Sequence, residues 1–127
     1  MPHVILAGAV DLGHVGDHLT GTVHRWRAAV IKAETCWLRS DGRAALVEGV
    51  VIEHSRPLHP VAVISLGRGD TSVRLWRQAP VERTPAVQRW LATIAHELRR
   101  LGAGPMQTTN IAVELLEDLE LADPARG

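Results

Sequence analysis

The chain has 127 residues, of which 46 % are hydrophobic and 22 % charged, and this composition excludes a disordered or collagen-like protein. Fourteen basic residues balance fourteen acidic ones, so the excess of positive charge on which nucleic-acid or anionic-membrane binding depends is missing. The single cysteine cannot form an internal disulfide, and no segment approaches the ~18–20 apolar residues of a membrane span. We therefore expect one cytoplasmic α+β domain over residues 1–127, without nucleic-acid or membrane partners.

The first segment, HVILAGAVDL at residues 3–12, predicts a buried strand that ends where Asp11 can cap a helix. Apolar residues then recur at three- and four-residue steps, which is the helical period. Three glycines in the same stretch each cost a helix about 1 kcal/mol relative to alanine. The spacing predicts an N-terminal helix over residues 12–27, with a loop as the alternative.

A β-hairpin is predicted next, because the hydrophobic period changes to two and the segments 28–39 and 43–54 flank Asp41 and Gly42. A two-residue turn at this Asp-Gly makes the numbers of opposing residues add to 83. That register pairs, on one face, Ile31 with Ile52, Ala33 with Val50, Thr35 with Glu48 and Trp37 with Leu46, and, on the other, Val30 with Glu53, Lys32 with Val51, Glu34 with Gly49 and Cys36 with Val47.

A second hairpin follows the loop SRPLHP, in which two prolines enforce an extended backbone. Its strands flank a turn at Gly69 and Asp70. With glycine first in the turn, Leu66 lies opposite Val73. The predicted sheet thus has four to five antiparallel strands, made of two hairpins and the N-terminal strand.

The clearest helix is RTPAVQRWLATIAHELRRLG, with Thr84 as N-cap, Pro85 at the first helical position and Gly102 as its end. The segment TTNIAVELLEDLELADP predicts a second helix, capped by Thr108 or Thr109. Residues 122–127 are expected to fray. Two C-terminal helices on one face of the sheet give a two-layer α+β sandwich.

The strand at 43–54 does not alternate between apolar and polar residues, so both faces of the sheet need a cover. The helices cover one face. Few residues remain for the second face, and a monomer seldom exposes so large an apolar surface. A second copy of the chain is the expected cover, and the protein is predicted to be a homodimer.

Three charged residues set into apolar strands are candidate catalytic groups: Glu48, Glu34 and Lys32. Burying an ionised group is costly unless it is paired, and functional sites are where such costs gather. Each residue also has a structural interpretation, as part of a bonded network or of an interface salt bridge. His54, Arg74 and Trp76 are the candidate substrate-binding residues.

The stretch GHVGDH places His14 and His18 four residues apart, on one face of a helix. A zinc site needs at least a third protein ligand, and Asp17 projects about 100° away from His18. Gly-rich phosphate loops, nucleophile elbows and dinucleotide fingerprints do not occur in the sequence. No metal and no cofactor are therefore expected.

Two functions fit these features. The first is a small homodimeric protein that binds a small molecule or peptide, and that can be a cofactor-independent tailoring enzyme such as a cyclase, isomerase or lyase. The second is a non-catalytic accessory or interaction module that docks through its apolar sheet face. A pocket with converging charges distinguishes the first function from the second.

Overall fold

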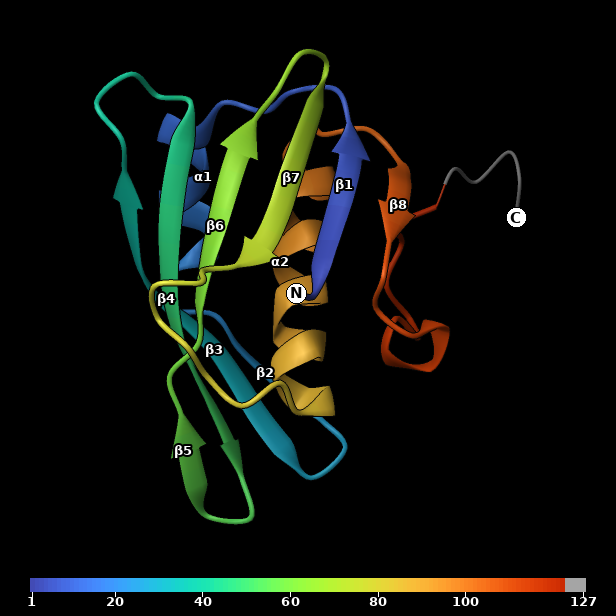
Figure 1. Ribbon diagram of the computed structural model, residues 1–127. Coiled ribbons are helices and arrows are strands. Elements are labelled where there is room, and N and C mark those ends of the chain that lie inside the picture. The colour runs from blue at the N-terminus through green and yellow to red at the C-terminus, as the bar shows by residue number, and fades with distance from the viewer. Residues whose placement is uncertain (123–127) are drawn as a thin grey trace.

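One curled antiparallel sheet dominates the computed structural model, which describes residues 1–122 (Figure 1). Its strand order is β2-β3-β4-β6-β7-β1-β8, and β5 also pairs with β4. The strands are β1 (His3–Ala7), β2 (Val23–Trp26), β3 (Ala29–Leu38), β4 (Ala44–Glu53), β5 (Arg56–Leu58), β6 (Val61–Leu66), β7 (Asp70–Leu75) and β8 (Met106–Thr109); the helices are α1 (Leu12–Leu19), α2 (Pro85–Arg100) and the short 3-10 helix η1 (Val113–Leu115).

The predicted fold class is wrong in its strand count, because the sheet has eight strands rather than four to five. The predicted second C-terminal helix is also wrong. Strand β8 occupies part of that segment and pairs with the edge of β1, where the Thr109 hydroxyl donates to the His3 carbonyl at 2.7 Å. Beyond β8, Ile111 and Leu115 are buried, so the apolar spacing reflects packing by an irregular segment. Most of the expected frayed tail, residues 123–127, lies outside the described residues.

The N-terminal helix is shorter than its apolar period indicates. Asp11 caps α1 as expected, and its side chain accepts a hydrogen bond from the Gly13 amide at 3.0 Å. The helix ends at Leu19, and Gly21 follows with a φ of 84°, a left-handed conformation that glycine adopts without steric cost. The residues after that turn form β2 on the edge of β3, because pairing with β3 outweighs the helical spacing.

The hairpin of β3 and β4 has the predicted register only near its turn. Thr35 pairs with Glu48 and Trp37 with Leu46, as expected. A β-bulge at Glu34 shifts the rest by one residue. The shifted pairs are Val30 with Ile52, Ile31 with Val51, Lys32 with Val50 and Ala33 with Gly49. An extra residue in one strand of a pair produces this shift.

Both predicted turns differ in detail from the structure. The Gly42 amide donates to the Arg39 carbonyl at 2.9 Å, which closes a longer loop than two residues, and Gly42 has a φ of 73°. In the second hairpin the turn is one residue earlier than expected, because the Gly67 amide donates to the Asp70 carbonyl. Its register is displaced by two, so side chains keep their predicted faces.

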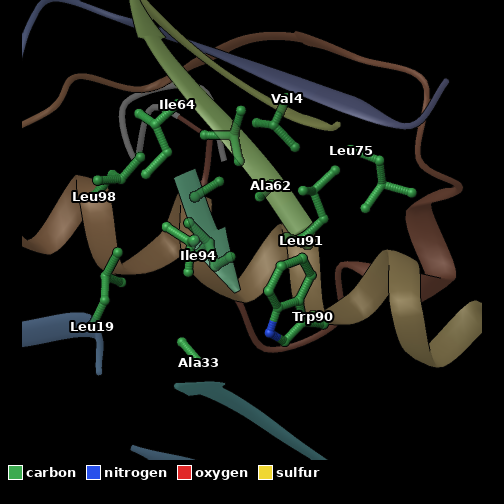
Figure 2. Packing of buried hydrophobic residues seen from close by; sticks show 14 of the residues in the cluster. Val4, Leu19, Ala33, Ala62, Ile64, Leu75, Trp90, Leu91, Ile94 and Leu98 are labelled. Atoms are coloured by element: carbon green, nitrogen blue, oxygen red, sulfur yellow. The ribbon is translucent and has the colours of Figure 1, made fainter. Parts of the chain in front are cut away.

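Helix α2 confirms its prediction at both ends and supplies much of the core. The Thr84 hydroxyl accepts from the Val87 amide at 3.2 Å, and the chain turns away at Gly102 with a φ of 121°. Figure 2 shows Trp90 of α2 among the buried aliphatic side chains. Its indole Nε1 donates to the Lys32 carbonyl at 3.0 Å, and a Cβ at Gly49 would stand 2.4 Å from that nitrogen. Glycine is therefore required at position 49.

The C-terminal segment is held against the outer side of α2 by side chains of the helix. Arg89, which is 9 % exposed, donates to the carbonyls of Leu115 and Glu117, and burial lowers the pKa of its guanidinium from the ordinary value. Arg99 donates to the Ala122 carbonyl at 2.7 Å. These arginines bind backbone oxygens rather than the acidic side chains of the segment. Within residues 1–122, no helix has the length and apolarity needed to cross a bilayer.

Candidate functional site

The two faces of the sheet have different surroundings. Both α-helices lie behind the sheet in Figure 1, and the buried residues of the strands belong to that covered face. Neither α1 nor α2 covers the face of the sheet that points toward the viewer in Figure 1, and we call this face the open face. The strands are apolar on both faces, as the sequence predicts for 43–54, so the open face joins exposed apolar groups to charged ones.

Four side chains on adjacent strands form what we call the central row of the open face. Trp37 pairs with Leu46, Leu46 with Val63, and Val63 with Arg74, so the row crosses β3, β4, β6 and β7. Trp37 is 60 % exposed, Arg74 is exposed, and the two aliphatic residues are half-buried. A shallow depression of about 300 Å³ lies at the Trp37 end of this row. The row therefore places an aromatic and a cation at opposite ends of an aliphatic surface.

Glu48 lies on the open face next to this row, but its expected burial is wrong. The side chain is exposed, and its Oε2 accepts a hydrogen bond from the Trp37 Nε1 at 2.6 Å. Thr35 lies directly opposite Glu48, as the sequence predicts. The bond to the indole fixes the carboxylate beside the aromatic ring.

The structure does not bring the three candidate catalytic residues together in one pocket. The bulge moves Lys32 opposite Val50, onto the same face as Glu48 rather than the reverse face expected from the sequence. Glu34 is exposed at the bulge and lines a separate groove between α1 and β3. Neither Lys32 nor Glu48 lines that groove.

The three candidate substrate-binding residues are also dispersed. His54 lies at the tip of the hairpin of β4 and β5, where it is exposed with a φ of 53°. Arg74 belongs to the central row. Trp76 follows β7, is half-buried, and lines a pocket of about 180 Å³ together with Arg77 and Arg83.

The groove between α1 and β3 has a volume of about 390 Å³ and contains the only cysteine. Cys36 is half-buried there, and this burial raises the pKa of its thiol. A raised pKa leaves little thiolate at neutral pH, and thiolate is the nucleophilic form. Asp17 and Glu34 also line the groove, so its charged groups are acidic.

Near the Trp37 end of the central row, Arg39 forms an ion pair with Asp41 in the loop between β3 and β4. The guanidinium donates to the carboxylate at 2.8 Å, and this hydrogen bond lowers the pKa of Asp41 from its ordinary value. Arg39 also lines the depression beside Trp37. The ion pair places two opposite charges at the loop beside the open face, and it adds no unpaired acid–base group to that face.

Sequence reasoning placed Glu48 and Trp37 on one face of the first hairpin and named Arg74 as a candidate residue, but it did not fix where Arg74 lies relative to them. The missing information was the pairing of β4 with β6, which brings the two hairpins side by side. The spacing of residues within a hairpin predicts only the pairs between its own two strands. It does not predict which strand of one hairpin pairs with which strand of the other. Comparisons with protein-family models, with curated proteins and with solved structures find no match to this chain.

Proposed function

We propose that this protein is a homodimeric, non-catalytic interaction module whose two copies pack through the open face. The observation that supports this most is the central row of Trp37, Leu46, Val63 and Arg74. Tryptophan and arginine are among the residues most enriched at the energetic centres of protein interfaces. In this row they flank two aliphatic residues that a partner can bury.

The row is complementary to itself under two-fold symmetry. An axis parallel to the strands, between β4 and β6, reverses the row in the second copy. Leu46 then faces Val63 of the second copy, and Trp37 faces Arg74 of the second copy. An interface of this kind is isologous, because each contact occurs twice. A guanidinium stacked on an indole adds a cation–π attraction to the aliphatic burial.

Glu48 adds charge complementarity to the same arrangement. Its carboxylate is held at the Trp37 indole by the 2.6 Å hydrogen bond. The Arg74 guanidinium that stacks on this indole from the second copy therefore meets a carboxylate at the ring edge. Opposite charges placed in this way select the register of an interface and suppress other pairings.

Exposure also favours a partner at this face. Trp37 is 60 % exposed and lies next to the half-buried Leu46, with the charged Glu48 beside it. Contiguous apolar surface rimmed by charge is typical of protein-interaction sites. We propose the cytoplasm as the location, because a single half-buried cysteine requires no oxidising compartment.

A charge-swap experiment tests the dimer. In sedimentation velocity through the micromolar range, we expect the wild-type protein to dimerise and Arg74→Glu and Glu48→Arg each to weaken the dimer at least tenfold. A mixture of the two variants restores both contacts in a heterodimer, since each Glu then meets an Arg. Arg68→Glu, an exposed arginine in the turn between β6 and β7, is the matched control and leaves the dimer unchanged.

The proposal is wrong if the wild-type protein sediments as a monomer at every concentration. It is also wrong if the wild type dimerises but the mixture of variants stays monomeric, because the dimer then uses another surface. Circular dichroism on each variant verifies that the fold is retained.

An acid–base enzyme is the second candidate, and the groove between α1 and β3 is the feature that favours it. The groove is large enough for a small molecule, and Glu34 lies in its wall. Enzymes of this kind need two or more positioned acid–base groups at one substrate. The groove contains Glu34 together with Asp17, but both are carboxylates, and the other two candidate catalytic residues, Lys32 and Glu48, lie outside it. The interaction module is therefore the function that the geometry supports better.

A further inference from the structure

We infer that α1 carries a two-histidine chelate for a divalent late transition-metal ion, of the class Cu²⁺, Ni²⁺ or Zn²⁺. His14 and His18 lie one helical turn apart on α1, and their Nε2 atoms share a hydrogen bond of 3.1 Å, in which one ring donates and the other accepts. The ring centroids are 4.6 Å apart. Both imidazoles thus present the same nitrogen to one small volume of solvent.

The separation of these nitrogens matches that of two cis ligands on one metal ion. Metal–nitrogen bonds of about 2.0–2.1 Å place two ligand nitrogens about 2.9 Å apart at a right angle and about 3.3 Å apart at the tetrahedral angle. The observed 3.1 Å lies between these values. Metal binding replaces the hydrogen bond between the rings: the donating imidazole transfers its Nε2 proton to its Nδ1 through solvent, and both exposed rings turn their Nε2 lone pairs toward one ion.

The helix holds the pair in place from its opposite side. Leu12, Val15 and Leu19 are buried in the core, which fixes the rotation of α1 about its axis. His14 and His18 are both exposed, so an ion reaches them directly from solvent. Imidazole is a preferred ligand of zinc, copper and nickel ions.

Within residues 1–122, no group of three or more His, Cys, Asp or Glu side chains is arranged to hold a metal. The chelate is therefore open, and water completes the coordination sphere. An open bidentate site binds more weakly than a closed four-ligand zinc site, whose ligands all come from the protein. The metal ion also binds the native helix in preference to the unfolded chain, because the two rings have no fixed separation in the unfolded chain.

This preference predicts that metal binding stabilises α1. The helix has eight residues and contains two glycines, so its own propensity is low. A ligand that binds only the native state stabilises that state by mass action. The ion then acts as a clamp across the last turn of the helix.

Isothermal titration of the tag-free protein with NiCl₂ and ZnCl₂ tests the inference. We expect one ion per chain, and at least a tenfold loss of affinity in both His14→Ala and His18→Ala. His59→Ala and His3→Ala remove histidines elsewhere in the fold and serve as controls with unchanged affinity. Zinc should also slow amide hydrogen exchange in residues 12–19 of the wild type and not of the His14→Ala variant.

Retention of wild-type affinity in the double variant His14→Ala/His18→Ala overturns the inference, because the ion then binds elsewhere. The absence of measurable heat and of exchange protection in the wild type overturns it as well. Both substituted residues are exposed, and circular dichroism verifies that each variant folds.

Discussion

Trp90 and Trp37 lie on opposite faces of the same pair of strands, and their surroundings differ. Trp90 is 1 % exposed between α2 and the sheet, whereas Trp37 is 60 % exposed on the open face. Each indole nitrogen nevertheless has a hydrogen-bond acceptor, the Lys32 carbonyl for Trp90 and the Glu48 carboxylate for Trp37. One residue type therefore serves the core on one face and remains available to a partner on the other.

The strands adapt to these two indoles in different ways. On the covered face, small residues make room for Trp90. Trp90 occupies the space that a Cβ at position 49 would need, and Ala33 pairs with Gly49 on the neighbouring strand. On the open face, Leu46 and Val63 extend from Trp37 as a continuous aliphatic surface. Close packing constrains residue size on the covered face, and the open face carries no such constraint until a partner binds.

The largest expected difference is between the two tryptophan-to-alanine variants. Trp90→Ala should lower the free energy of unfolding by about 3–5 kcal/mol, because it removes a buried side chain and leaves a cavity. Trp37→Ala should change it by less than about 1 kcal/mol when measured on dilute protein. Urea denaturation followed by far-UV circular dichroism measures both values. Equal losses in the two variants would contradict the assignment of the faces.

Two glycine-to-alanine variants, one on the covered face and one on α1, should change the free energy of unfolding in opposite directions. Gly49→Ala should destabilise the protein by about 1–3 kcal/mol, since its Cβ would stand 2.6 Å from the Lys32 carbonyl oxygen as well as against Trp90. Gly16→Ala on α1 should stabilise it by about 0.5–1 kcal/mol, because the new Cβ meets Cys36 at an ordinary 3.5 Å. Thermal and urea unfolding give the sign. Stabilisation by Gly49→Ala would show that Trp90 has room to move.

The smallest expected effect is on the chemistry of Cys36. Burial raises the pKa of this thiol, so the thiolate fraction at pH 7–8 should be lower in the native protein than in the urea-unfolded chain. Alkylation by iodoacetamide, followed by mass spectrometry, should be slower in the native protein and should accelerate as the pH rises toward the raised pKa. Equal rates in the two states at neutral pH would contradict this.

The candidate site was only partly predictable. Glu48 and Arg74 stand out as charges within apolar strands, and the pairing of Trp37 with Leu46 follows from the Asp-Gly turn. The position of Lys32 was not predictable, because the bulge at Glu34 reverses the face of every earlier residue in β3 relative to the register from the turn. The Lys32 carbonyl, two residues before the bulge, accepts a hydrogen bond from the indole of Trp90, which is distant in the sequence, so no local sequence signal marks the bulge.

By itself the sequence determined the elements whose signals are local. Helix α2 has its N-cap, its apolar stripe and its glycine end within about twenty residues, and the Asp11 cap of α1 is equally local. Tertiary structure decided the roles of β2 and β8, because edge strands form when a neighbouring strand offers unpaired backbone groups. It also decided which face stays open, since this depends on where α1, α2 and the C-terminal segment pack after the sheet has curled.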